Sequence, residues 1–251
     1  MNPRVQRLLF YLLLLLAWFG VARLKLWPPY LFPDPVEVLK TLRQGFWDHS
    51  FSLGILKSIR RIALGYAFSA GVGILLGLWT ARVRWMENTV GSLLVGLQTL
   101  PSICWLPAAI LWFGLSEGAI LFVVIMGALM AISIGTHDAV KNLPPIYNRA
   151  ALTMGVRGFR LYREVIFPAA LPGIVSALKQ GWSFAWRSLM AGELLFVSPG
   201  LGHLLQMGRD LNDISLVVAV MLVIMALGWS VDRFIFSAWE QRLRRQRGMS
   251  S

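Results

Sequence analysis

The sequence predicts an all-α membrane protein, a polytopic bundle of six transmembrane helices. Of its 251 residues, 57% are hydrophobic and only 14% are charged, a balance too apolar for a soluble domain. Several apolar stretches reach the roughly 20 residues that a helix needs to cross a bilayer. No strand-length alternating segments are spaced for a barrel, and an open sheet would leave backbone groups unpaired in lipid. We therefore expect a single transmembrane domain over residues 1–251.

Six apolar stretches qualify as spanning helices. They are residues 8–26, 62–81, 90–113, 119–136, 172–196 and 214–236. The first stretch follows a short basic segment, as in a signal peptide, but no small-residue cleavage site comes after it. We expect a retained anchor. The single cysteine, Cys104, excludes a disulfide framework within the chain.

The formal net charge of +12 is better explained by membrane topology than by nucleic-acid binding, because the basic residues are scattered between apolar runs. Lysine and arginine are enriched in cytoplasmic loops. If both termini are cytoplasmic, more than half of the 24 lysines and arginines lie on that side: Arg4, Arg7, Arg82, Arg84, Lys141, Arg149, Arg157, Arg160, Arg163, Arg242, Arg244, Arg245 and Arg247. We therefore predict that both termini face the cytoplasm.

The exception to this pattern is a long outer connection, residues 27–61, which is also basic. Charges in longer segments weigh less on topology. Within it, Asp34 can cap a helix that has Pro35 at its first position. The apolar positions of that helix share one face: Val36, Leu39, Leu42 and Phe46. The favoured interpretation is an amphipathic helix at the membrane surface, and the alternative is contact with an external partner.

Between the fourth and fifth spans lies the basic segment NRAALTMGVRGFRLYREVIFP, residues 148–168. A helix that Asn142 caps, with Pro144 and Pro145 in its first turn, is expected to end at Gly155 in a left-handed conformation.

A second short helix, from about residue 158 to residue 166, is expected to end at Pro168, before Pro172 starts the fifth span. The result is a helical elbow over residues 144–168. The residues alone leave two interpretations: a basic loop held by anionic lipid headgroups, or a docking surface for another protein.

The spacing within the elbow resembles the EAA loop of ABC importer permeases. The family pattern is Glu-Ala-Ala, three residues, Gly, nine residues, then Ile-x-Leu-Pro, and Ala150, Ala151, Gly155 and Pro168 stand in that register. Arg149 stands where the family usually has Glu. Val165 and Phe167 replace the family's Ile and Leu.

Other stretches are similar to the permeases for taurine, aliphatic sulfonates, nitrate and bicarbonate: LFPDPVEVL, SIRRIALGYAFSAGVGILLGL, LPSICWLPAAILWFGLSE and AGELLFVSPGLGHLL. The resemblance implies a type I ABC importer permease of the bacterial inner membrane. It also implies partners: a second permease copy as a homodimer, two ATP-binding cassette subunits, and a periplasmic or lipid-anchored solute-binding protein. The elbow would then be the helix that docks on the ATPase, with Arg149, Ala150, Ala151, Gly155, Val165 and Pro168 as its coupling residues.

The chain has no G-x-x-x-x-G-K-[ST] phosphate loop, so the backbone cradle and lysine that hold ATP phosphates are missing. We therefore expect a non-catalytic subunit with no cofactor or metal of its own. ATP and Mg²⁺ would be bound by the partner ATPase.

Charged residues within spans are costly and tend to face protein or water. Lys179 can extend to the headgroups, but Arg187 lies near mid-depth. Arg187 either faces the translocation path and favours an anionic substrate, or pairs with another helix or protomer; Glu193, six residues on, is on a different face. Gln98 and Ser102 in the third span could add polar contacts to that path.

Three other functions remain open from the sequence. The substrate could be another small solute, such as a vitamin precursor. A lipid-modifying enzyme that holds a headgroup with His137 and Asp138 lacks a clustered set of acid, base and metal ligands. A secondary transporter would be expected to show an inverted hydropathy repeat, and none is seen.

Overall fold

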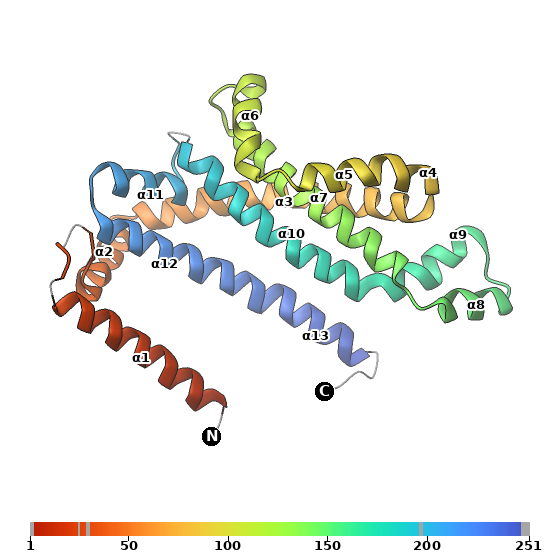
Figure 1. Cartoon of the computed structure of the whole chain (residues 1–251), viewed down its shortest axis with the longest axis horizontal. Coiled ribbons are helices and arrows are strands. Elements are labelled where there is room, and N and C mark those ends of the chain that lie inside the picture. Colours follow the sequence, from red (N-terminus) through yellow and green to blue (C-terminus); the bar gives the residue numbers. More distant parts are fainter. Residues whose placement is uncertain (1–2, 25, 29–30, 196–197, 247–251) are drawn as a thin grey trace.

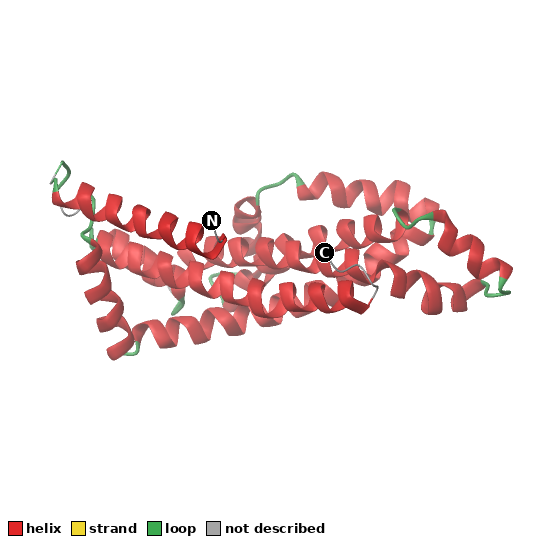
Figure 2. Ribbon diagram, turned by 90° about the horizontal axis from the view of Figure 1, so that it is seen from below, coloured by secondary structure: helices red, strands yellow, loops and turns green. Residues whose placement is uncertain are grey.

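The computed structural model describes residues 3–24, 26–28, 31–195 and 198–246, and this part of the chain contains helices and no strand (Figure 2). Phe196, the predicted end of the fifth span, and Arg247 lie outside the described residues. The helices are α1 (Pro3–Arg23), α2 (Pro35–Trp47), α3 (Ser50–Arg82), α4 (Arg84–Met86), α5 (Ser92–Gln98), α6 (Leu106–Phe113), α7 (Glu117–Lys141), α8 (Pro145–Thr153), α9 (Gly158–Leu161), α10 (Phe167–Leu195), α11 (Leu201–Asp210), α12 (Ile214–Val231) and α13 (Ser237–Gln246). Short 3₁₀ and π-helical segments join some of them: η1 (Glu87–Gly91), η2 (Ser102–Trp105), η3 (Tyr162–Ile166) and η4 (Asp232–Phe236).

The predicted all-α membrane bundle is confirmed. Five helices among the described residues are long and apolar enough to cross a membrane: Val5–Arg23, Ser50–Arg82, Glu117–Lys141, Gly158–Leu195 and Ile214–Leu243. A bent pair makes a sixth candidate, so the expected number of spans is reached only if that pair counts as one span.

The third predicted span, residues 90–113, is not one continuous helix. Helical residues Arg84–Gln98 and Ser102–Phe113 meet at an angle of 103°. Pro101 lies at the bend and lacks the N–H that a continuous helix needs there, whereas Pro107 is in the first turn of α6, where proline is tolerated. The bend makes α6 project from the rest of the bundle (Figure 1).

The second span begins earlier than predicted. We expected residues 57–61 in the outer connection, but α3 starts at Ser50 and includes them. Arg61 is consequently inside a helix and only 2% exposed. The sequence-based boundary was wrong because it treated Lys57, Arg60 and Arg61 as the end of an apolar run, whereas Arg61 pairs with the buried Glu193 and with Glu117.

The fifth span also begins earlier than predicted. Pro168 does not end a short helix, because α9, η3 and α10 form one helical stretch from Gly158 to Leu195, with Pro172 inside α10. A proline at position 168 has no N–H to donate to the carbonyl group of Glu164. The π-helical turn of η3, Tyr162–Ile166, comes just before this missing bond and accommodates it without a break.

Helix α7 packs between α3 and α10, and these three long helices form the centre of the bundle (Figure 1). Glycines permit the close approach. A Cβ atom on Gly77 of α3 would lie 2.5 Å from the carbonyl oxygen of Ser133, and one on Gly135 of α7 would lie 2.6 Å from Cβ of Ala177. Small residues at such contacts let helix backbones come together in a membrane.

The outer connection contains the predicted helix. Asp34 caps α2 by accepting a 2.9 Å hydrogen bond from the backbone N–H of Val36. The apolar face that we expected stays largely exposed, since Leu39 is 64% exposed, whereas Val38 is buried against the bundle. Helix α1 lies at the edge of the bundle (Figure 1), and the indole N–H of Trp18 donates to the carbonyl oxygen of Pro33 at 3.1 Å.

Candidate functional site

A cavity of about 260 Å³ lies where the bend of the third span meets α7 and α10. Its lining includes the three residues predicted for a substrate path, Gln98, Ser102 and Arg187. The break after α5 turns Gln98 and Ser102 toward α10, which is why residues on two different spans share one cavity. We call it the Arg187 pocket.

Arg187 is exposed within this chain and carries an uncompensated charge. Its Nε donates a 3.1 Å hydrogen bond to the carbonyl oxygen of Ser183, and its guanidinium carbon lies 4.7 Å from the centroid of the Phe184 ring. No carboxylate within the described ranges comes within 4.0 Å of it. The in-chain ion pair that could have explained Arg187 is therefore absent from the part of the chain that the structure describes, which leaves the translocation path and a pair with another protomer as its two roles.

Glu193, the acidic residue of α10, belongs to a buried network at the opposite end of α10 from the elbow. Its carboxylate is 0% exposed and accepts a 2.9 Å hydrogen bond from Nη1 of Arg61, which is 2% exposed. The hydroxyl of Ser58 lies 2.7 Å and 2.8 Å from the two carboxylate oxygens. We call Ser58, Arg61 and Glu193 the Glu193 network.

The network fixes the connection between α10 and α11. The backbone N–H of Gly202 donates to Glu193 Oε2 at 2.9 Å, and that of Leu201 donates to Ser58 Oγ at 2.9 Å. Gly200 leaves room for the carboxylate, because a Cβ atom there would lie 2.6 Å from it, and Gly202 leaves room for Cβ of Glu193, which would lie 2.5 Å from an added Cβ atom. Arg61 also donates to the carbonyl oxygen of Pro199 at 3.0 Å.

One further acid joins Arg61 from the start of α7. Nη2 of Arg61 lies 2.9 Å from Glu117 Oε1, and the Glu117 side chain is 54% exposed. Arg61 thus ties α3 to α7 and α10 at once. Sequence reasoning missed this network because it placed Arg61 in a connecting segment and left Glu193 without a partner.

The elbow lies at the other end of the bundle (Figure 1). Its first helix, α8, starts at Pro145, and Asn142 terminates α7 rather than capping α8, so that predicted cap is wrong. Gly155 ends α8 as predicted, with φ of +79°. The backbone N–H of Val156 donates to the carbonyl oxygen of Ala151 at 2.9 Å, closing the turn.

The two alanines of the elbow face different ways. Ala151 is 3% exposed, whereas Ala150 and the adjacent Arg149 are exposed. Ile146 and Met154 are also exposed, at 68% and 80%. The outer side of α8 therefore offers small, apolar and basic groups together. Val165 is half-buried on η3 and Pro168 is exposed at the start of α10.

Near the elbow, His137 is part of a polar junction with Thr80 and Glu87, and the neighbouring Asp138 lines the same cavity as these residues. His137 Nδ1 lies 3.2 Å from Thr80 Oγ1, and its Nε2 lies 3.6 Å from Glu87 Oε1. Lys141 Nζ lies 2.6 Å from Glu87 Oε2. These contacts join α7 to α3 and η1. The described residues contain no group of three or more His, Cys, Asp or Glu side chains placed to hold a metal ion.

Comparison with known proteins identifies the family. Residues 73–245 match the family described as binding-protein-dependent transport system inner membrane component. The chain belongs to this family. It is a permease subunit of an ABC transporter and is not itself the polypeptide that hydrolyses ATP.

Several curated permeases are similar to this one. A putative ABC transporter permease protein of Methanocaldococcus jannaschii is 33% identical over 70% of this chain and 66% of its own length. The nitrate import permease protein of Synechocystis is 26% identical over 81% of this chain and 77% of its own. The taurine transport system permease protein of Escherichia coli is 28% identical over 87% of this chain and 82% of its own.

Solved structures share the fold of this permease. A chain of the MetNI methionine ABC transporter, in an inward-facing form, superposes with a TM-score of 0.67 at 19% identity, over 77% of this chain and 95% of that one. A chain of an amino acid ABC transporter crystallised with histidines gives a TM-score of 0.65 at 16% identity, over 80% and 97%. The predicted type I importer permease fold is thereby confirmed.

Proposed function

We propose that this permease forms the membrane path for a small anion and that the Arg187 pocket is part of that path. The observation that carries the proposal is the convergence of Gln98, Ser102 and Arg187 on one cavity, with a guanidinium that no carboxylate of the described chain neutralises. An arginine binds oxyanions through several N–H donors at once. An amide and a hydroxyl next to it can complete the hydrogen bonds of a sulfonate, nitrate or bicarbonate.

The relatives support this substrate class. Among the similar permeases are those named for nitrate, taurine, aliphatic sulfonates and bicarbonate, and each of these solutes carries an anionic group. One relative, in Halalkalibacterium halodurans, is named a formylaminopyrimidine transport permease. A vitamin precursor without a negative charge is thus the second candidate, and an arginine at the pocket favours the anion over it.

We further propose that the elbow, residues 144–168, docks on a separate ATPase subunit that binds ATP and Mg²⁺. Support comes from the exposed face of α8, where Ile146 and Met154 stand beside Arg149 with no covering element among the described residues. A second copy of the permease, two ATPase subunits and a periplasmic or lipid-anchored binding protein would complete the importer. The elbow would then transmit closure of the ATPases to the bundle, with both chain termini in the cytoplasm.

The substrate proposal is tested by uptake into proteoliposomes that contain the permease, its ATPase and its binding protein. Arg187→Gln is expected to lower uptake of the anion by roughly 10- to 100-fold, since a hydrogen bond to a charged group contributes about 1.5 to 3 kcal/mol. The matched control is Arg209→Gln, which removes an exposed arginine of α11 that pairs with Asp210 at 3.6 Å and should transport normally.

Two results would contradict the proposed substrate. Unchanged anion uptake by the Arg187→Gln variant would remove this arginine from the path. Uptake of an uncharged pyrimidine by the unmodified importer, in preference to taurine, nitrate and bicarbonate, would favour the second candidate.

A further inference from the structure

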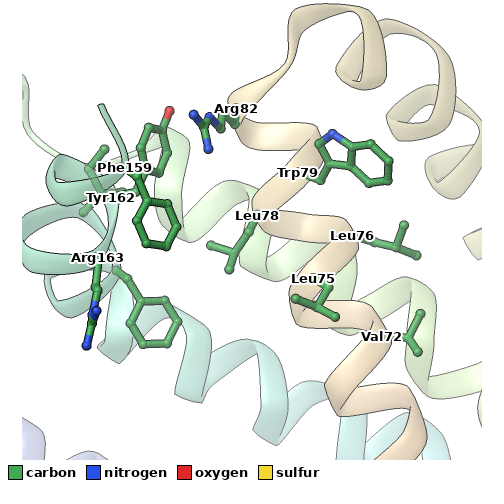
Figure 3. A pocket seen from close by; sticks show the side chains of 11 residues that line it. Val72, Leu75, Leu76, Leu78, Trp79, Arg82, Phe159, Tyr162 and Arg163 are labelled. Carbon is green, nitrogen blue, oxygen red and sulfur yellow. The ribbon is translucent and has the colours of Figure 1, made fainter. Parts of the chain in front are cut away.

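A second and larger cavity, of about 660 Å³, lies away from the Arg187 pocket, between the last three turns of α3 and the α9–η3 part of the elbow (Figure 3). One wall is an apolar row on α3 that includes Val72, Leu75 and Trp79. The facing wall carries the rings of Phe159 and Tyr162. We call this the α3–η3 groove.

The groove opens outward from the bundle and is not part of its core. Leu75, Trp79 and Phe159 line it and are 68%, 56% and 69% exposed. It is adjacent to α3, a helix long and apolar enough to cross the membrane, and we expect the exposed apolar side chains of its wall to face lipid acyl chains. Covering this apolar surface with an acyl chain requires no desolvation of polar groups, so contact with lipid does not destabilise the protein.

One end of the groove is basic. Arg82, the last residue of α3, has its guanidinium carbon 4.8 Å from the centroid of the Tyr162 ring across the groove, and Figure 3 shows it turned toward that ring. Arg163 lines the same cavity. Among the described residues, neither arginine has a carboxylate within 4.0 Å, whereas the nearby Arg160 is paired with Glu164 at 3.1 Å.

The aromatic residues mark the level of the membrane surface. Tryptophan and tyrosine concentrate where headgroups meet acyl chains, and Trp79 and Tyr162 lie at the same end of the groove as Arg82. Arginines at that level attract anionic lipids of the cytoplasmic leaflet. The basic end of the groove therefore coincides with the headgroup level, and its apolar wall extends from there toward the membrane interior.

We propose that the α3–η3 groove binds one anionic phospholipid, whose phosphate contacts Arg82 and whose acyl chain lies along Leu75 and Val72. Arg163 supplies a second cation at the edge of the site. The bound lipid braces η3, the π-helical turn that joins the elbow to α10, against α3. This site is independent of the transported substrate and stands whether or not the Arg187 pocket binds an anion.

The test is lipid titration of the detergent-purified permease, in complex with its ATPase, followed by native mass spectrometry. Phosphatidylglycerol is expected to bind in preference to phosphatidylcholine at one site per permease chain. Arg82→Gln should weaken phosphatidylglycerol binding by roughly fivefold, the effect of one arginine near an anionic lipid, and weaken phosphatidylcholine binding less, because the choline cation offsets the charge of its phosphate. Arg84→Gln is the matched control because Arg84 does not line the groove.

A second variant tests the apolar wall without removing charge. Leu75→Trp places a bulky ring on an exposed position of the wall and should lower the occupancy of both lipids, while the ATPase still co-purifies. Equal binding of the two lipids, or unchanged phosphatidylglycerol binding by both variants, overturns the proposal. Displacement of the lipid by millimolar inorganic phosphate would also overturn it, because it would indicate a site for free anions. A disulfide between two Leu75→Cys chains would overturn it as well, because it would indicate that a second copy fills the groove.

Discussion

At the α11 end of the bundle, Arg61 and Glu193 are 2% and 0% exposed and are paired with each other. At the α8 end, by contrast, Arg149 is exposed and has no carboxylate nearby among the described residues. An arginine is therefore buried and paired at one end, and exposed and unpaired within the described chain at the other. The carboxylate of the buried pair has further polar partners, the hydroxyl of Ser58 and the backbone N–H of Gly202. The exposed arginine leaves its donors available to a second molecule.

The difference indicates what each region can do. Two charges that leave water must be compensated by each other and by further hydrogen bonds, or the folded state is destabilised. The Glu193 network therefore has a positional role: it fixes the α10–α11 connection on α3. The exposed face of α8 contributes little to the fold, and its composition is free to suit a partner. Substitutions at the two ends should separate stability from assembly.

The largest effect is expected from Glu193→Leu. It leaves the guanidinium of Arg61 buried without its main partner, and breaking a buried pair in this way costs about 3 to 5 kcal/mol. The thermal unfolding temperature of the purified permease should fall steeply. Glu117→Gln is the matched control, because this acid contacts the same guanidinium but is 54% exposed, and an exposed pair contributes about 0 to 1 kcal/mol.

A comparably small effect of both substitutions would show that the Glu193 network is not needed to hold the α10–α11 connection. The double variant Arg61→Met with Glu193→Leu sharpens the result. Because replacement of a buried pair by apolar residues is often neutral, it should recover part of the stability that Glu193→Leu alone loses, although the N–H of Gly202 still lacks its acceptor.

A smaller effect on stability is expected at the elbow from Gly155→Val. Gly155 has φ of +79°, and a Cβ atom added there would meet open space, so the cost is backbone strain, about 1 to 2 kcal/mol for an L-residue in this conformation. A β-branched side chain is especially poor there. The end of α8 should shift, and co-purification of the ATPase and ATP-driven uptake should both fall.

Gly71→Val is the control for that experiment. Gly71 lies on α3 with no atom within 4 Å of a Cβ position and an ordinary helical φ, so valine should be accepted there. Normal uptake and normal ATPase binding by Gly155→Val would argue against the elbow as the docking element, even though the bundle itself is correctly folded.

Local signals in the sequence predicted part of this architecture. The Asp34 cap and the left-handed Gly155 depend on residues within a few positions of each other, and both are confirmed. Arg61 and Glu193 are 132 positions apart, and no periodicity or cap could have paired them. The rule that proline ends a helix failed at Pro168, because a π-helical turn absorbs the lost hydrogen bond.

The Arg187 pocket was predicted from the sequence in part: its residues were named, but not the bend that brings them together. Span assignments placed Arg187 at mid-depth, and the scarcity of charge in membranes made it a candidate. That Gln98 and Ser102 lie beside it depends on the 103° bend of the third span. Pro101 lies at that bend, but a proline does not by itself fix the angle. The substrate role of these residues stays a prediction, as does the coupling role of the elbow.

The smallest effect on stability is expected from Arg149→Ala, the exposed counterpart of the buried Arg61. Exposed substitutions that break no packing or pairing change the free energy of unfolding by about 0.5 kcal/mol or less, so the unfolding temperature should stay the same. If α8 docks on an ATPase through this arginine, the complex of the variant should lose part of its salt sensitivity, because an exposed ion pair is screened as ionic strength rises. The measurement is retention of the ATPase by the permease at low and at high salt. The same salt dependence of retention for the variant and the unmodified permease would mean that Arg149 makes no ionic contact with the ATPase. Helix α8 would then dock through Ile146, Ala150 and Met154 alone.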